Sequence, residues 1–197
     1  MQIFTSERPL AWGELDLPVL GMTGDWYGQP LDPPLGFTIA ADSSNLWFVA
    51  TRQAPALCHP GAEPGGFTEG LWEYDVAELF MADPESGAYL EFNLAPNGAW
   101  WAAKFTSPRV RSQVQPDFGA AVTAHFSDGG DGTWFAALAI PTAFLKEHVG
   151  FGSGETANVT CIMNSPQQTF HSACKLPGSE PDFHQPSHFS RLVRIPA

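Results

Sequence analysis

The stretch Tyr89-Leu-Glu-Phe-Asn-Leu-Ala-Pro-Asn-Gly-Ala-Trp-Trp101 predicts a β-hairpin whose first strand has two unlike faces. Successive side chains of a strand point to opposite sides of a sheet. One face is therefore apolar and requires a core: Leu90, Phe92 and Leu94. The other face carries an aromatic ring, a carboxylate and an amide, from Tyr89, Glu91 and Asn93. This second face either meets water or holds a ligand.

The segments on both sides of this stretch extend the pattern. We predict a strand over residues 72–81, followed by a turn at residues 83–87 that leads into the hairpin. In that strand one side carries Trp72, Tyr74, Val76, Glu78 and Phe80, and the other carries Ala77, Leu79 and Met81. We place the turn of the hairpin at Ala95-Pro-Asn-Gly98. On the return strand, Trp101, Ala103 and Phe105 alternate with Trp100, Ala102 and Lys104.

The rest of the chain predicts further short strands joined by turns. They cover residues 36–41, 45–51, 120–126, 133–140, 157–163 and 191–195. Only residues 141–146 suggest a helical turn, with Pro141 near its first position. Nine to eleven strands in two antiparallel sheets indicate an all-β fold, a β-sandwich with at most short helical turns. We expect one domain over residues 1–197, with residues 1–34 packed on or beside the sandwich.

Composition narrows the classes of partner. The chain has 197 residues, of which 9 are Lys or Arg and 21 are Asp or Glu, for a net charge of −12. Nine basic residues cannot supply the basic stripe that nucleic acid requires, and the negative charge opposes anionic membrane surfaces. A neutral or cationic ligand is easier to accommodate, and the oligomeric state is left open.

Two features of the chain favour a cytoplasmic protein. The first residues, Met-Gln-Ile-Phe-Thr-Ser-Glu-Arg8, lack the basic and apolar regions of a signal peptide. Cys58, Cys161 and Cys174 are odd in number and lack C-x-x-C spacing, so a disulfide framework is not expected.

Four motifs in order resemble one known family. They are Gly70-Leu-Trp-Glu73, Glu78-Leu-Phe80, Tyr89-Leu-Glu-Phe-Asn93 with Pro96-Asn-Gly-Ala-Trp100, and Pro181-Asp-Phe-His184 with Phe189. Together they resemble the DOMON-like superfamily, in particular an uncharacterised bacterial branch similar to family 9 carbohydrate-binding modules. The resemblance covers about residues 35–195.

The resemblance implies a non-catalytic β-sandwich that grips a terminal sugar between two tryptophans. It assigns Trp72 as the first tryptophan and Glu78 as a glutamate that bonds sugar hydroxyls. The second tryptophan has no counterpart, because no Trp follows Trp134. The corresponding C-terminal stretch offers instead Phe170, His171, Phe183 and His184.

The residues themselves also fit a sugar. A pyranose presents an apolar face to an aromatic ring and a rim of hydroxyls to planar polar groups. The candidate ligand-binding set is Trp72, Tyr74, Glu78, Tyr89, Glu91, Asn93, Trp100 and Lys104, rimmed by Arg109, His171 and His184. The alternative is an interaction or scaffold protein with a filled face, in which the two tryptophans pack under a loop and Glu91 pairs with Lys104.

Catalysis and cofactors are weaker hypotheses. Glu78 and Glu91 could form the carboxylate pair of a glycosidase, since neighbouring strands meet the required separation by chance. Haem ligation could draw on Met22, Met81, Met163 and His171, but Met more often fills apolar gaps. We expect neither catalysis nor a cofactor.

Metal sites are also a weaker hypothesis. His171, Asp182, His184 and His188 lie close in sequence but lack a tight ligand motif. We favour a structural Asp182–His184 hydrogen bond that fixes the C-terminal loop. The loop with Asp128 and Asp131 could hold Ca²⁺, but it lacks the alternating oxygen ligands of an EF-hand, so a turn is the preferred interpretation.

Overall fold

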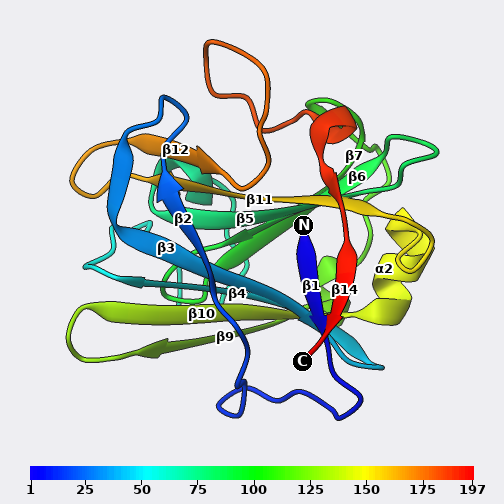
Figure 1. Cartoon of the computed structure of the whole chain (residues 1–197), viewed down its shortest axis with the longest axis horizontal. Helices are drawn as coiled ribbons and strands as arrows, with labels where there is room; N and C mark the ends of the chain where they lie inside the picture. Colours follow the sequence, from blue (N-terminus) through cyan, green and yellow to red (C-terminus); the bar gives the residue numbers. More distant parts are fainter.

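Fourteen strands form two sheets that pack face to face, a β-sandwich, in a computed structural model that describes all residues from Met1 to Ala197 (Figure 1). Sheet A has the order β14-β1-β3-β4-β10-β9, with β2 also beside β3. Its strands are β1 (Gln2–Thr5), β2 (Leu20–Gly24), β3 (Pro30–Ala41), β4 (Asn45–Gln53), β9 (Thr123–Asp128), β10 (Thr133–Pro141) and β14 (Val193–Pro196).

Sheet B has the order β12-β11-β5-β6-β7-β8, with β13 also beside β11. Its strands are β5 (Val76–Ala82), β6 (Tyr89–Leu94), β7 (Trp100–Ser107), β8 (Val110–Arg111), β11 (Thr156–Met163), β12 (Thr169–Ser172) and β13 (Ser190–Arg191). Strand pairing is antiparallel throughout both sheets, except that β1 runs parallel to β3 and to β14. The prediction of an antiparallel β-sandwich is confirmed.

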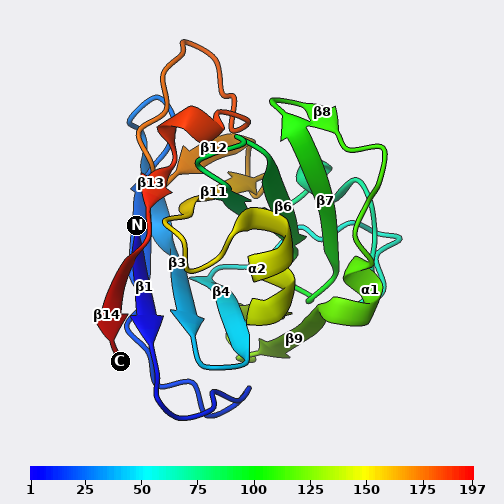
Figure 2. The same cartoon turned by 90° about the vertical axis from the view of Figure 1, so that its right-hand side faces the viewer.

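Helical structure is limited to four short segments. These are α1 (Phe118–Ala121), α2 (Thr142–Val149) and the 3₁₀ turns η1 (Leu71–Glu73) and η2 (Pro186–His188). Figure 2 shows α2 at one open end of the sandwich, beside β4 and β6. No helix has the length and apolar character needed to cross a bilayer.

The predicted alternation in β5 and β6 is present. Ala77, Leu79 and Met81 of β5, with Leu90, Phe92 and Leu94 of β6, belong to the buried core of 32 residues between the two sheets. The opposite parity faces away from sheet A and joins a second buried cluster that includes Val76, Phe80, Tyr89, Phe183 and Phe189. The C-terminal segment therefore covers part of the outer face of sheet B.

The strand predicted over residues 72–81 begins later than expected. Gly70 adopts φ 89° and the 3₁₀ turn η1 follows it, so β5 starts only at Val76. The buried carboxylate of Asp75 accepts hydrogen bonds from the backbone N–H groups of Leu57 and Asn164. These bonds anchor the chain just before the strand, and Trp72 and Tyr74 consequently do not follow the parity of β5.

The turn of the β6–β7 hairpin contains one residue more than predicted. Ala95 N–H donates to Ala99 O at 2.8 Å, Gly98 N–H donates to Ala95 O at 2.9 Å, and Gly98 has φ 77°. This is a three-residue loop that ends in a left-handed glycine. The extra residue inverts the parity of the return strand.

The register of β7 follows from this loop. Asn93 pairs with Trp101, and Leu94 pairs with Trp100. Directly opposed residues of an antiparallel pair share a face, so Trp101 lies on the outer face and Trp100 in the core between the sheets. Lys104 pairs with Leu90 and also lies on the inner side. The prediction that Trp100 and Lys104 share a face with Glu91 is wrong.

The N-terminal part of the chain contributes to sheet A. Residues 2–5 form β1, and residues 6–19 cross the outer face of this sheet without regular structure. Leu10, Trp12, Leu15 and Leu17 pack there against a small buried cluster that includes Trp47. The two termini lie at neighbouring strands of one sheet edge (Figure 1).

Candidate ligand-binding site

A pocket of about 360 Å³ opens on the outer face of sheet B. We call it the aromatic pocket, because six of its thirteen lining residues are aromatic: Trp72, Phe80, Trp101, Phe105, Phe170 and Phe183. Five more are ionisable or basic: Glu78, Glu91, Arg109, Arg111 and His184. Ile162 and Pro181 complete the lining. Its walls come from η1, β7, β12 and the C-terminal loop, and its carboxyl groups come from β5 and β6.

Two tryptophans stand together in one part of the lining. The rings of Trp72, from η1, and Trp101, from β7, have centroids 5.3 Å apart and planes at 71°. The guanidinium of Arg111 lies 4.6 Å from the centre of the Trp101 ring, in cation–π range. Phe170 and Phe183 form a second aromatic pair, with centroids 6.3 Å apart. A planar apolar ligand face thus meets several rings inside one pocket.

Two buried carboxyl groups lie side by side in the pocket. Glu78 is directly opposite Asn93 on the neighbouring strand, and Glu91 lies two residues before Asn93, so the two glutamates occupy diagonal positions on one face. Glu78 is 3% exposed and Glu91 is 5% exposed. Thr160 Oγ1 donates a hydrogen bond to Glu78 Oε2 at 2.6 Å, whereas Glu91 Oε2 has no hydrogen-bond partner.

Burial makes both carboxyl groups weak acids. It raises the pKa of Glu78 to about 7, although the hydrogen bond from Thr160 acts in the opposite direction. Burial also raises the pKa of Glu91 well above its usual range, and the negative charge of Glu78 raises it further. A buried carboxylate without a hydrogen-bond donor is unfavourable. A ligand that donates hydrogen bonds to it therefore gains more free energy from these bonds than it would from the same bonds in water.

His184 is a neutral imidazole at this site. Burial and the charge of Arg109 lower the pKa of His184 to about 4. Its Nδ1 lies 2.7 Å from the hydroxyl of Tyr89, which in turn accepts the backbone N–H of Arg109 at 3.2 Å. The hydroxyl proton of Tyr89 is therefore free to bond Nδ1, which leaves the ring proton on Nε2. This nitrogen lies 3.9 Å from Glu91 Oε2.

The two arginines at the pocket are each paired with an exposed carboxylate outside the buried carboxyl pair. Arg109 Nη2 lies 2.8 Å from Asp182 Oδ1, and Arg111 Nη1 lies 2.7 Å from Glu69 Oε1. Asp182 Oδ1 also accepts the backbone N–H of His184 at 3.1 Å. The predicted Asp182–His184 hydrogen bond is thus present, but its donor is the backbone of His184 and not the imidazole.

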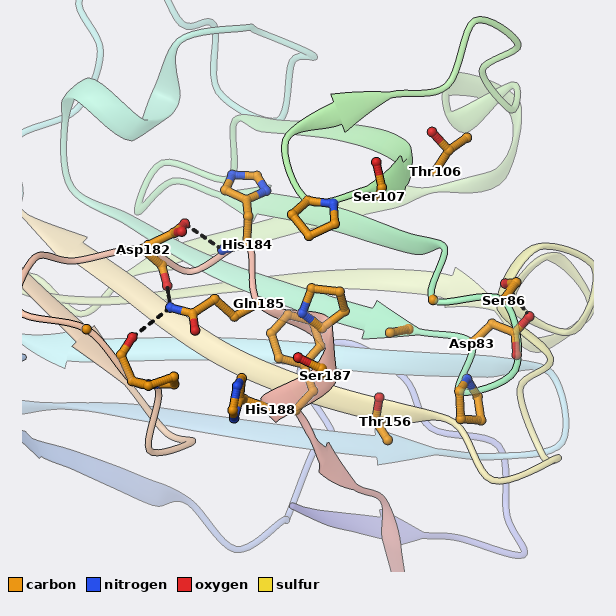
Figure 3. A pocket seen from close by; sticks show the side chains of 18 of the residues that line it. Asp83, Ser86, Thr106, Ser107, Thr156, Asp182, His184, Gln185, Ser187 and His188 are labelled. Carbon is orange, nitrogen blue, oxygen red and sulfur yellow. Dashed lines mark hydrogen bonds between the residues drawn. The ribbon is translucent and has the colours of Figure 1, made fainter.

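A larger polar groove of about 960 Å³ adjoins the aromatic pocket, and His184 lines both. The groove runs between the turn at residues 83–87 and the loop at residues 177–189 (Figure 3). Within it, Gln185 Nε2 donates to the backbone oxygens of Asp182 and Pro177, both at 2.9 Å. These bonds hold the loop that carries Phe183 and His184 into the aromatic pocket.

The structure brings together five of the predicted site residues as pocket lining: Trp72, Glu78, Glu91, Arg109 and His184. Two more lie just behind the lining on the same face. Tyr89 is fully buried and stacks on Phe105 with ring centroids 4.8 Å apart. Asn93 is 0% exposed, and neither its amide nitrogen nor its oxygen has a partner.

Four predicted residues lie elsewhere. Trp100 and Lys104 are on the inner side of β7, as described above. Tyr74 packs edge-on against His59, with ring centroids 4.9 Å apart. His171 is buried, and its ring nitrogens lie 3.0 Å from Gly24 O and 2.8 Å from Thr169 Oγ1. Because His171 pairs with the core residue Cys161 across β11 and β12, it faces the space between the sheets.

Eight lining residues were absent from the predicted set: Phe80, Trp101, Phe105, Arg111, Ile162, Phe170, Pro181 and Phe183. The sequence holds a signal for Trp101 and Phe105. A two-residue hairpin loop of type I′ needs positive φ at both positions, which Pro96 cannot adopt. Pro96-Asn-Gly98 instead suits a type I turn followed by a left-handed glycine, and this loop places Trp101 and Phe105 on the face of Glu91. No comparable signal marks Arg111.

The residues considered for cofactors lie in structural roles. Met22, Met81 and Met163 are buried in the core between the sheets. Asp128 Oδ1 and Asp131 Oδ1 accept the backbone N–H groups of Gly130 and Thr133, so this segment forms the preferred turn. No group of three or more His, Cys, Asp or Glu side chains has the arrangement of a metal site.

Comparison with other proteins identifies similar folds. No protein-family model matches the chain. The chain is 24% identical over 178 residues to the UPF0462 protein C4orf33 homolog of Danio rerio, and this alignment covers 83% of each chain.

Several solved structures of other proteins have a similar fold over nearly the whole chain. A candidate carbohydrate-binding protein from Bacteroides uniformis superimposes with a TM-score of 0.73 at 18% identity over 98% of both chains. A family 9 carbohydrate-binding module from Caldicellulosiruptor kristjanssonii, in complex with cellotriose, gives 0.63 at 12% identity over 100% of this chain and 95% of that chain. Its glucose complex gives 0.61 at 13% identity over 100% and 97%. At these identities the similarity establishes a shared β-sandwich fold.

Proposed function

We propose that this protein is a non-catalytic binding protein that holds a small saccharide in the aromatic pocket. One observation carries the proposal: a buried carboxyl oxygen without a partner, Glu91 Oε2, lies in a pocket walled by aromatic rings. Sugar hydroxyls donate hydrogen bonds to carboxylates, and such charge-assisted bonds are stronger than neutral ones. The C–H face of the same sugar packs on tryptophan.

The comparisons and the motifs support this proposal. Two of the similar structures are family 9 carbohydrate-binding modules bound to cellotriose and glucose. The motif order that resembles the bacterial DOMON-like branch falls largely on this site, since Trp72, Glu78, Glu91 and His184 all line the pocket. We therefore propose membership of that branch, with Trp72 and Glu78 in the roles that the resemblance implies. Phe170 and Phe183 supply aromatic surface in the C-terminal stretch where a second tryptophan is absent.

The two rival functions receive less support. A filled interaction face would have side chains in place of the pocket, whereas the pocket here is open. A glycosidase needs one carboxyl group that stays protonated and one that is ionised, in environments that push the two pKa values apart. At this site, burial raises the pKa of both Glu78 and Glu91. Binding is therefore the better account of this pair.

Two broader features belong with this proposal. We propose that residues 1–197 form a single domain, because β1 and β14 at the two ends of the chain pair within one sheet. We also propose a cytoplasmic location, because the three cysteines are unpaired, as is usual in a reducing compartment.

A titration of mono- and disaccharides that follows tryptophan fluorescence tests the saccharide proposal. Trp72→Ala should weaken binding by about fivefold or more, since the loss of one stacking ring costs about 1 kcal/mol or more. Trp12→Ala is the matched control, because Trp12 is also half-buried but lies on the outer face of sheet A. The proposal fails if no saccharide changes the fluorescence, or if both variants bind as the unmodified protein does.

A further inference from the structure

The acidic floor of the aromatic pocket has no basic side chain to balance it. Glu78 receives one hydrogen bond, from the neutral hydroxyl of Thr160. The one basic nitrogen within 4.0 Å of Glu91 belongs to the neutral ring of His184. Both carboxyl groups are almost completely removed from water, so solvent does not screen their charge there.

The nearby arginines supply only part of the missing charge: burial and the negative charge of Glu78 raise the pKa of Glu91 by more than the charges of Arg111 and Arg109 lower it. Arg109 and Arg111 reach the pocket, but their guanidinium groups pair with Asp182 and Glu69. Four acidic and two basic side chains thus surround the site, so the local balance is acidic when the two glutamates are ionised. The net charge of −12 on the whole chain has the same sign. Long-range and local fields therefore both favour a cation.

We infer that the aromatic pocket selects a hydroxylated amine, specifically an amino sugar, whose ammonium group binds beside Glu91 and Glu78. The inference rests on the proposed saccharide function and adds the charge of the ligand to it. An ammonium group has three donors and no acceptor, which suits a floor whose free groups are carboxyl oxygens. The aromatic ring of Trp72 favours the same charge through cation–π attraction, as the ring of Trp101 already does for Arg111. The remaining hydroxyls of the sugar meet the polar edge of the pocket at His184 and Arg109.

Proton exchange provides an independent readout. Burial raises the pKa of both glutamates, so near pH 7 the empty pocket holds protons on them that exposed glutamates would have lost. An ammonium group that takes this position holds the carboxyls ionised, and the displaced proton leaves to the solvent. The other titratable groups near the floor stay neutral through the neutral range: burial lowers the pKa of His184 to about 4, raises that of Tyr89 to about 12 and raises that of the Cys161 thiol on β11. The released proton can therefore be assigned to the glutamates.

Matched pairs of sugars test the inference on the unmodified protein. Glucose and glucosamine, galactose and galactosamine, and mannose and mannosamine differ within each pair only by hydroxyl and ammonium at one carbon. Calorimetric titrations at about pH 7 measure the affinity of each sugar. Their comparison in two buffers of different ionisation enthalpy measures the protons released on binding. Neither buffer is itself a hydroxylated amine. At least one amino sugar should bind about tenfold or more tightly than its neutral partner, with proton release. N-Acetylation of that sugar should remove the preference.

Variants locate the effect at Glu91. Glu91→Gln should abolish the preference, so that an amino sugar and its neutral partner bind this variant equally, and Glu85→Gln, in an exposed turn, should leave the preference unchanged. If the neutral sugars bind as tightly as the amino sugars or more tightly, the inference is wrong and the saccharide function stands. If no sugar of either kind binds, both proposals are wrong. Because the sugar pairs are compared on the unmodified protein, a folding defect in Glu91→Gln does not affect this decision.

Discussion

At the scale of single residues, Glu78 shows the conflict between stability and binding. Its carboxyl group lies in an antiparallel sheet with apolar neighbours on its own strand, and Thr160 supplies its one hydrogen bond. Burial raises its pKa from 4.5 to about 7. The folded protein therefore holds this proton more tightly than the unfolded chain does. A position selected only for stability would carry an apolar side chain here, which avoids the cost of burying a carboxyl group. The presence of Glu78 is therefore consistent with a role in a ligand site.

This shift predicts how Glu78→Gln changes stability with pH. Between about pH 4.5 and 7 the folded state of the unmodified protein binds more protons at Glu78 than the unfolded state, so its stability falls as the pH rises. The variant lacks this loss. Its free energy of unfolding should be close to that of the unmodified protein near pH 4 and should exceed it at pH 8, because Gln keeps an acceptor for Thr160.

Urea unfolding of both proteins at several pH values measures this difference. A constant difference across the range would contradict the raised pKa. Taking the difference between the two proteins also removes the opposite contribution of His184, whose lowered pKa makes stability rise with pH between about 4 and 6.5.

At the scale of elements, the β6–β7 hairpin determines which tryptophan enters the site. Gly98 ends its loop with φ 77°, and a methyl group added at its Cα would lie 2.8 Å from Phe126 Cδ1 and 3.0 Å from Phe126 Cβ. The loop is thus constrained both by its backbone conformation and by β9, which packs against it. Its length, in turn, sets the parity of Trp100 and Trp101.

We expect Gly98→Ala to destabilise the protein more than Gly130→Ala does. Both glycines have nearly the same positive φ, 77° and 78°, so both variants lose about 1–2 kcal/mol for the left-handed conformation. Gly130 has nothing within 4 Å of an added Cβ, whereas Gly98 also meets Phe126. Equal losses in urea unfolding experiments would show that Phe126 moves away without cost.

At the scale of the whole molecule, negative charge dominates. The chain carries 21 acidic and 9 basic residues, and few of the acidic ones are paired: the ion pairs to arginine involve Asp182, Glu69 and Glu155. Repulsion among the remaining carboxylates opposes the compact state. The same field attracts cations to the aromatic pocket.

We therefore expect added salt to stabilise the fold. Between about 0.01 M and 0.15 M sodium chloride the screening length falls from about 30 Å to about 8 Å, which weakens repulsion between distant carboxylates. The melting temperature should rise over this range at neutral pH. The rise should shrink near pH 4, where many carboxylates are protonated. A fall in melting temperature at neutral pH would mean that the ion pairs outweigh the repulsion.

Much of the fold and part of the site follow from the sequence, because alternation is a local property. A strand turns successive side chains to opposite faces whatever surrounds it, so Leu90, Phe92 and Leu94 could be assigned to the core and Glu78 and Glu91 to a common outer face. Turn chemistry is local as well. In the β3–β4 hairpin, Asp42 Oδ1 accepts the backbone N–H groups of Ser44 and Asn45. Short strands such as β1, β12 and β13 have too few residues to show alternation.

Only the tertiary structure decided which side chains meet across strands and loops. The register of β7 depends on one residue in the hairpin loop, and it exchanges Trp100 for Trp101 at the pocket. Trp72 reaches the pocket from a 3₁₀ turn, and Phe183 and His184 reach it from a loop about 90 residues further along the chain than Glu91. Such positions depend on packing between distant segments, which no short-range periodicity encodes. The sequence thus determined the two faces of each central strand, and the packing of distant segments determined what covers them.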